Sequence, residues 1–282
     1  MSQTTIEVKH LQKYYGKHMG VEDVSLRVEK GEIFGFLGSN GAGKSTTIRC
    51  LLGLIRPSRG EITLLGKKDT VLAHELNHIG YMPSEAQFYP SMKVKDVIKL
   101  AALAHRKDCS KEAKRLCQIL EVPLQKRIRD LSLGNRKKVS IVCALQHQPQ
   151  LLILDEPTSG LDPLMQERFF ELIKEACAAG ASCLLSSHVL SDIKNYCDRV
   201  AIIKDGRILK VDTIERLTRS QSKQVTYWKD GQNQKFDFSG SGRQLLDRLA
   251  KLEPDDFLVE EPSLEDFFLH YYEEENNDFN QA

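Results

Sequence analysis

The stretch Gly38-Ser39-Asn40-Gly41-Ala42-Gly43-Lys44-Ser45 decides how this chain folds. It matches the pattern G-x-x-x-x-G-K-[ST], in which glycines let the backbone turn tightly so that successive N–H groups point at phosphate oxygens. The lysine of such a loop reaches the β- and γ-phosphates, and the serine hydroxyl ligates Mg²⁺. We therefore predict a phosphate site over residues 38–46, ending at Thr46, with Lys44 as a catalytic cation and Ser45 as a metal ligand.

The segments on either side of this loop fit the motif. Residues 33–37 (IFGFL) are a short apolar run typical of a buried strand, and residues 46–52 (TTIRCLL) read as a helix. A helix that begins here turns its positive end toward a bound anion. A glycine-rich turn that binds nothing is the structural alternative, and the strand and helix around the loop argue against it.

Length and composition narrow the class of protein. At 282 residues the chain is long enough for about two domains, and its 41% hydrophobic and 28% charged residues are ordinary for a globular protein. The formal net charge of +1 argues against a nucleic-acid partner. We expect no membrane span and no signal peptide. The seven scattered cysteines form no C-x-x-C pair, which favours reduced core thiols over a zinc site.

The first half of the chain predicts strands and then helices. Val24, Leu26 and Val28 alternate with polar residues, as in a half-buried strand, and residues 61–65 (EITLL) form another short strand. The pattern becomes helical from Val94 to about Leu120, and we expect five of its residues to share an apolar face: Val94, Val97, Ile98, Ala101 and Leu103. The same region is basic, which fits either a solvated helical face or a docking surface.

Buried strands return in the second half. Residues 151–154 (LLIL) and 182–186 (SCLLS) carry no polar alternation, which is typical of a parallel sheet covered on both faces. Between them, Asp162 is a good N-cap, Pro163 fits the first helical position and Gly180 ends the helix. Two strand-like runs around Asp205-Gly206 predict a hairpin.

The composition changes after about Arg219. Two β-rich runs around Asp230-Gly231 predict a second hairpin, and residues 239–242 (SGSG) read as a flexible connector. Leu245, Leu246, Leu249 and Leu252 predict one amphipathic helix. A further helix start is expected at Ser263, with Phe267, Phe268 and Tyr271 on its apolar face, and a disordered acidic tail from Glu273.

Two carboxylates end the apolar strand at 151–154. We expect Asp155 to hold Mg²⁺ through its water shell, and Glu156 to polarise a water toward a γ-phosphate as the catalytic base. A plain strand end is the alternative, and the nearby phosphate loop argues for the metal and base roles.

Two other segments are more ambiguous. Residues 131–135 (LSLGN) precede a helical pattern, so Ser132 and the adjacent N–H groups fit either a second anion site or simple N-capping. His188 follows a buried strand, where it either faces a phosphate or has no catalytic role.

Taken together and in this order, these features resemble the ATP-binding cassette (ABC) ATPases over roughly residues 6–211. Tyr15 looks like the aromatic residue that stacks on adenine, and residues 131–135 look like the family's LSGGQ signature, which implies that Ser132 and Gly134 bind ATP. Asp155 and Glu156 are similar to the Walker B end. Residues 159–162 resemble the D-loop, which adds Asp162 to the nucleotide-binding residues, and His188 resembles the switch histidine.

Two positions depart from the family pattern. Ser84 stands where a Q-loop glutamine is usual and is too short for the same direct contact with Mg²⁺, so that a water or Gln87 has to serve instead. The signature carries Leu133 and Asn135 in place of Gly and Gln, while Ser132 and Gly134 remain.

The resemblance implies an α/β P-loop cassette with a mixed sheet, an antiparallel β subdomain and a helical subdomain. We assign it to residues 1–218, with the helical subdomain at about 86–148 and a small α+β accessory domain at 219–282. It also implies an ATPase that uses ATP and Mg²⁺ and closes head to tail with a second cassette, most simply another copy. The tail resembles exporter ATPases of the drug and antibiotic type.

The function that follows is the ATPase subunit of an ABC exporter, attached to the inner face of the cell membrane through a separately encoded permease. A soluble cassette that acts on nucleic acid or the ribosome is the main alternative. Its members usually carry two cassettes or a long coiled coil, and this chain has one cassette and no sustained heptads. A nucleotide-binding regulator with little turnover is a third possibility, suggested only by Ser84.

Overall fold

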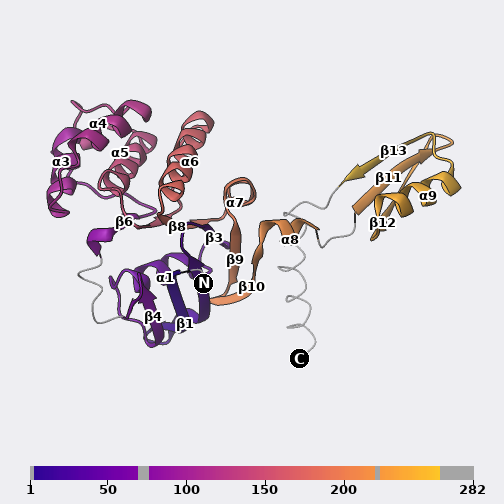
Figure 1. Cartoon of the computed structure of the whole chain (residues 1–282), viewed down its shortest axis with the longest axis horizontal. Coiled ribbons are helices and arrows are strands. Elements are labelled where there is room, and N and C mark those ends of the chain that lie inside the picture. Colours follow the sequence, from indigo (N-terminus) through magenta and orange to yellow (C-terminus); the bar gives the residue numbers. More distant parts are fainter. Residues whose placement is uncertain (1–2, 69–75, 220–222, 261–282) are drawn as a thin grey trace. The chain divides into compact units, whose positions relative to one another are not determined.

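The computed structural model describes residues 3–68, 76–219 and 223–260. The chain divides into two compact units, Met1–Val211 and Asp212–Ala282 (Figure 1). In the part of the chain that is described, no helix is both long and apolar enough to cross a membrane. The helix start expected at Ser263 and the acidic tail from Glu273 lie outside the described residues.

One mixed sheet organises the first unit. Its ten strands lie in the order β5-β4-β1-β2-β10-β9-β3-β8-β7-β6. Their bounds are β1 Thr4–Tyr15, β2 His18–Glu29, β3 Ile33–Leu37, β4 Arg59–Leu64, β5 Lys67–Lys68, β6 Ile79–Met82, β7 Leu151–Asp155, β8 Ser182–Ser187, β9 Arg199–Lys204 and β10 Arg207–Thr213. Strands β9, β3, β8, β7 and β6 run parallel, whereas β1 pairs antiparallel with β2 and β4. The mixed sheet expected from the sequence is confirmed.

The parallel strands that carry the predicted chemistry are buried along their whole length. All residues of β3, β7 and β8 are buried, as their lack of polar alternation indicated. Phe34 and Phe36 of β3 join Ile153 and Leu184 in one apolar core that extends to the antiparallel strands. Parallel strands end at the same edge of a sheet, so the loops that follow them are brought together there.

Helices flank the sheet, and α3, α4 and α5, which lie between β6 and β7 in the chain, gather in a separate helical layer (Figure 1). Their bounds in the first unit are α1 Lys44–Leu51, η2 Leu76–His78, α3 Val94–Ala104, α4 Ser110–Ile119, η3 Ile128–Asp130, α5 Leu133–Leu145, α6 Pro163–Ala178 and α7 Leu190–Tyr196. All seven cysteines are free thiols, as expected, and five of them are buried.

The helical pattern from Val94 to about Leu120 is confirmed and forms two helices, α3 and α4. The shared apolar face is wrong at one position: Val94, Val97 and Ile98 are buried, but Leu103 is 65% exposed. Nine residues separate Leu103 from Val94, which places it on the opposite side of a helix with about 100° per residue. Both Asp-Gly hairpins form as predicted, β9–β10 in this unit and β11–β12 in the second.

The second unit contains a three-stranded antiparallel sheet in the order β12-β11-β13 and a helix that packs on it. Its elements are α8 Ile214–Arg219, β11 Lys223–Lys229, β12 Gln232–Phe238, α9 Gly242–Leu252 and β13 Asp256–Glu260. Leu245 and Leu249 are buried against Val225, but Leu246 is 62% exposed, contrary to the expected apolar face.

The flexible connector expected at residues 239–242 is also wrong in part. Ser241 is the N-cap of α9, in a capping box with Gln244, and Gly242 is already helical. Strand β13 was not predicted from the sequence.

Candidate functional site

The phosphate loop joins β3 to α1, as the sequence predicted. Gly41 and Gly43 have φ values of +86° and +107°, a backbone conformation that favours glycine. Gly38 is restricted by space, because a Cβ there would lie 2.5 Å from the carbonyl oxygen of Ile203 on β9. The neighbouring strand therefore fixes the start of the loop.

Lys44 is the first residue of α1 and is 5% exposed. Its Nζ donates to the carbonyl oxygens of Gly38 (2.6 Å) and Ser39 (3.1 Å), and it lies 3.2 Å from Oε1 of Glu156. An ammonium group with no water around it has to be paired, and here its partners are the loop itself and the predicted catalytic carboxylate. The cation expected at this site is thus directed into it.

Asp155 ends β7, next to Ser186 on β8 in the parallel register. Its side chain is buried, with 2% exposure, and its Oδ1 accepts a hydrogen bond from the Ser186 hydroxyl at 2.5 Å. One carboxylate oxygen is therefore fixed by the neighbouring strand. Ser186 was not among the residues predicted from the sequence. The available signal was a serine near the end of a buried strand, and this serine would lie next to Asp155 if the two strands paired.

Glu156 is the first residue of the loop after β7, and its backbone is left-handed, with a φ of +49°. Its Oε2 lies 2.7 Å from Nδ1 of His188, while Oε1 has no hydrogen-bond partner among the described residues beyond the ion-pair distance to Lys44. The His188 side chain is 47% exposed. The fold thus brings together Lys44, Glu156 and His188, the three residues predicted to be catalytic.

The signature segment forms the N-terminus of α5. The Ser132 hydroxyl accepts from the backbone N–H of Asn135 at 3.3 Å, so the N-cap interpretation of this serine is met, while its phosphate role stays a prediction. Gly134 packs on Gly160, whose carbonyl oxygen would lie 2.7 Å from a Cβ at position 134. Asp162 caps α6 by accepting from the Met165 N–H at 3.0 Å. Ser132 and Asp162 are both exposed.

Tyr15 lies beside the phosphate-binding helix. A Cβ at Gly20 would lie 2.8 Å from the Tyr15 ring and 3.3 Å from the Thr46 side chain, so both residues border the same glycine. The ring is exposed and has Lys13 Nζ 5.1 Å from its centroid. An exposed ring next to the loop fits the predicted stacking on adenine, which stays a prediction.

Ser84 follows β6, the strand next to β7, and Met82 pairs with Leu154 in that register. The loop that carries Ser84 therefore leaves the sheet at the same edge as Asp155. Tyr81, one residue before Met82, has its phenol pKa raised by burial and then by the charge of Asp155. Position 84 thus lies at the same edge of the sheet as Asp155 and Glu156.

The residues at this edge fit a Mg²⁺–nucleotide. Hydroxyl and carboxylate oxygens from Ser45 and Asp155 are the hard donors that Mg²⁺ prefers. Lys44 and the loop N–H groups suit phosphate. The carboxylate oxygen of Glu156 that lacks a hydrogen bond gives the set an acceptor with room for one more donor. Among the described residues, however, no group of three or more His, Cys, Asp or Glu side chains forms a cluster able to hold a metal by itself.

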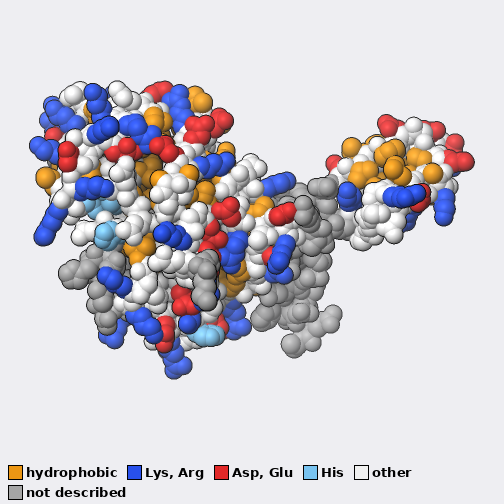
Figure 2. All heavy atoms as spheres, viewed as in Figure 1, with side chains coloured by type: hydrophobic (Ala, Val, Ile, Leu, Met, Phe, Trp, Pro, Cys, Tyr) orange, Lys and Arg blue, Asp and Glu red, His pale blue; other side chains and the backbone are white. Residues whose placement is uncertain are grey.

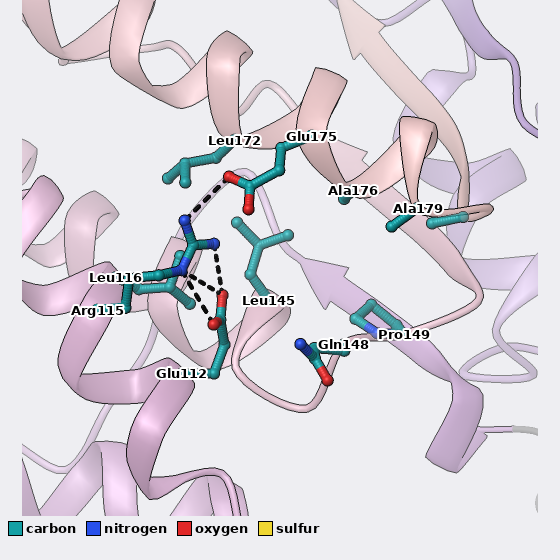
Figure 3. A pocket seen from close by; sticks show the side chains of 11 residues that line it. Glu112, Arg115, Leu116, Leu145, Gln148, Pro149, Leu172, Glu175, Ala176 and Ala179 are labelled. Atoms are coloured by element: carbon teal, nitrogen blue, oxygen red, sulfur yellow. Dashed lines mark hydrogen bonds and ion pairs between the residues drawn. The ribbon is translucent and has the colours of Figure 1, made fainter.

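A separate cavity of about 300 Å³ lies between α4, α5 and α6 (Figure 3). Arg115 spans it, with bonds to Glu112 on its own helix and to Glu175 on α6 at 2.9 Å. These two carboxylates raise the guanidinium pKa. The cavity shares no residue with the predicted phosphate site, and its charged groups are paired with one another.

Comparison with known proteins gives consistent matches. The family model described as ABC transporter matches residues 21–159. The bacitracin transport ATP-binding protein BcrA of Bacillus licheniformis is 35% identical over 82% of this chain and 76% of its own length. The linearmycin resistance ATP-binding protein LnrL of Bacillus subtilis is 35% identical over 74% of this chain and 69% of its own. A solved ATP-binding subunit of an ABC transporter aligns with a TM-score of 0.70 at 35% identity, covering 77% of this chain and 93% of that subunit.

Proposed function

Since this chain belongs to the family of ABC transporter ATP-binding proteins, we propose that it hydrolyses ATP at residues 38–46, 155, 156 and 188 to drive a separate membrane subunit. The observation that carries the proposal is the meeting of Lys44, Glu156 and His188 at the carboxyl edge of the parallel strands. These residues are far apart in sequence and supply a phosphate-binding cation, a carboxylate base and an imidazole at one place.

ATP binding uses the loop and the helix that follows it. Backbone N–H groups of residues 39–46 contact the phosphates at the positive end of α1. The Lys44 ammonium exchanges its bonds to the loop carbonyls for phosphate oxygens. Tyr15 stacks on the adenine. Ser45 and Asp155 hold Mg²⁺, which supplies neutralisation of phosphate charge.

Hydrolysis uses the groups at the end of β7. A water attacks the γ-phosphorus, the bond from that phosphorus to the leaving ADP oxygen breaks, and the proton of the water passes to the Glu156 carboxylate. His188 orients this carboxylate through the 2.7 Å contact of Nδ1 with Oε2, and its exposed ring presents the other nitrogen to the γ-phosphate. The ion pair with Lys44 keeps the second carboxylate oxygen next to the phosphate site.

The signature segment serves a second copy of the chain. Ser132 and Asp162 are exposed at helix N-termini. The Ser132 hydroxyl caps α5, and the Asp162 carboxylate caps α6. In the proposed dimer these segments, with Gly134, complete the ATP site of the facing subunit. ATP then stabilises the closed pair, and loss of the γ-phosphate contacts releases it.

The membrane partner is a separately encoded permease, and the transporter is an exporter of the multidrug or antibiotic type. BcrA acts in bacitracin transport and LnrL in linearmycin resistance, which supports this class of substrate. The helical layer is the proposed docking region. Figure 2 shows Lys and Arg side chains gathered over it, and the exposed lysines there include Lys95, Lys99 and Lys107. The chain thereby attaches to the cytoplasmic face of the cell membrane.

Glu156→Gln tests the proposed chemistry. The amide cannot accept the proton, so kcat should fall roughly 100-fold or more, while ATP binding persists and an ATP-dependent dimer accumulates. Steady-state phosphate release and light scattering after size exclusion measure the two effects. Glu171→Gln is the control, because Glu171 is an exposed carboxylate on α6. Equal rates for wild type and Glu156→Gln refute the proposal for Glu156.

The proposed membrane partner is tested by purifying this chain from mild detergent extracts of the cells in which it naturally occurs. The Glu156→Gln chain, held with ATP, should recover one polytopic membrane protein in a stable ratio. Recovery of no membrane protein in several detergents contradicts the transporter subunit, and salt-sensitive binding to RNA or DNA supports the soluble alternative instead.

A further inference from the structure

Lys137 is a buried lysine that none of the predicted motifs includes. It lies in the second turn of α5, two residues after the signature segment, and is 1% exposed. A buried ammonium is retained only when its hydrogen bonds and charge are compensated, so its partners identify its role. Its Nζ donates to the backbone carbonyl oxygen of Glu156 at 2.8 Å.

The peptide groups on both sides of the Glu156 Cα are fixed by hydrogen bonds. The N–H of Glu156 donates to the carbonyl oxygen and to the hydroxyl oxygen of Ser186, both at 3.2 Å. Its carbonyl oxygen accepts from Lys137. Glu156 has a left-handed backbone conformation, which is unfavourable for residues other than glycine. This conformation persists only where the surrounding structure holds it. Ser186 holds one end of this residue and Lys137 holds the other.

The charges around the Lys137 ammonium belong to the same site. Burial lowers the pKa of Lys137, and Asp155, Glu156 and Glu85 oppose that shift. Asp155 and Glu156 at the end of β7, and Glu85 in the loop after β6, are thus near enough to act on the charge of this ammonium. Lys138, the next residue, is only half-buried and lacks this position.

We propose that Lys137 is a positioning residue for hydrolysis, which holds the Glu156 backbone so that the carboxylate points to Lys44 and His188. This inference rests on the proposed role of Glu156 as the base. It also gives the signature helix a direct connection to the catalytic carboxylate, because Lys137 belongs to α5, which begins at Ser132. Displacement of α5 would therefore displace the base.

The test compares variants of the full chain. Lys137→Met keeps the length of the side chain and removes the donor, and Lys137→Gln keeps an N–H donor on a shorter side chain. Lys138→Met is the matched control. We expect Lys137→Met to lower kcat about 10- to 100-fold, because small misplacement of a catalytic group has effects of this size, and to change KM and ATP affinity less than about threefold. Lys137→Gln should recover part of kcat, and Lys138→Met should match wild type.

The decisive measurement combines Lys137→Met with Glu156→Gln. If Lys137 acts through Glu156, it should change the residual rate of the Glu156→Gln chain less than about twofold, because the two residues work as a unit. An equal fold-loss in both backgrounds, or a tenfold loss of ATP affinity, overturns the positioning role. Wild-type kcat in Lys137→Met with a large loss in Glu156→Gln overturns it too, and leaves the proposed function intact. Equal rates in wild type and Glu156→Gln refute the proposed function, and the inference with it.

Discussion

The two Asp-Gly hairpins have the same turn but different surroundings. In β9–β10 the turn residues Asp205 and Gly206 have φ values of +47° and +76°, and in β11–β12 Asp230 and Gly231 have +52° and +75°. Both are therefore two-residue turns with left-handed residues at both central positions, which suits the twist of a hairpin. Locally the two turns are nearly the same structure.

The two turns differ in what they contact. The N–H of Gly206 donates to the carbonyl oxygen of Ala42 in the phosphate loop at 3.0 Å, and its own carbonyl oxygen accepts from the N–H of Glu22 at 2.9 Å. A Cβ at Gly206 would lie 2.7 Å from the Glu22 nitrogen, whereas one at Gly231 would meet no described atom within 4 Å. The same local signal thus gives a turn that contacts the predicted phosphate loop in one unit and a turn that only connects two strands in the other.

Gly206→Ala should give the largest effect, because it adds a backbone clash to the left-handed φ. We expect the first unit to lose about 2–4 kcal/mol in free energy of unfolding, and ATP affinity to fall about tenfold as the Ala42 contact shifts. Urea unfolding followed by circular dichroism and titration with a fluorescent ATP analogue measure these changes. Wild-type ATP affinity in this variant would show that the turn does not support the loop.

The second largest difference between the two units should be in how their stability depends on pH. Acid should destabilise the first unit through a pair of histidines. His147 is buried, stacks on His105 with ring centroids 3.6 Å apart, and lies near Lys107 and His78. Burial and then His105 lower the pKa of His147 to about 4. The unfolded chain, with a pKa near 6.5, therefore binds the proton first, so stability present at pH 7.5 is lost as the pH falls toward 4.

Between pH 7.5 and 5 this histidine should contribute a loss of about 2 kcal/mol to the first unit. Denaturant midpoints at both pH values measure it. His147→Phe keeps an aromatic ring against His105 and cannot take a proton, so its unfolding should depend less on pH. An unchanged pH dependence in His147→Phe would assign the acid sensitivity to other groups.

Gly231→Ala should have the smallest effect and is the matched partner of Gly206→Ala. Only the left-handed φ opposes the added methyl group, so we expect about 1 kcal/mol of destabilisation confined to the second unit. Trp228, the single tryptophan, lies on β11 and reports unfolding of that unit by its fluorescence. ATP hydrolysis should match wild type, and a lowered kcat would show that the second unit acts on the site.

Local structures were predictable from the sequence where a short pattern of residues strongly favours one conformation. The phosphate loop between a strand and a helix, the Asp162 cap with Pro163, and both Asp-Gly turns all depend on neighbours within a few residues. Faces of helices were predicted less well: Leu103 and Leu246 are apolar but exposed. At about 100° per residue, their spacing from the buried residues of the same helix turns both away from the buried face. The strand β13 was missed because its pairing with β11 is decided by contacts outside the strand itself.

The sequence by itself determined the chemistry available to this protein: a phosphate loop, two carboxylates at the end of an apolar strand, and a histidine after another. Only the tertiary structure decided that Glu156 lies between Lys44 and His188, that Ser186 fixes Asp155, and that the buried Lys137 bonds to the backbone of Glu156. The reason is that these contacts join segments far apart in the chain. Their meeting depends on strand order and register in the parallel sheet, which no local pattern encodes.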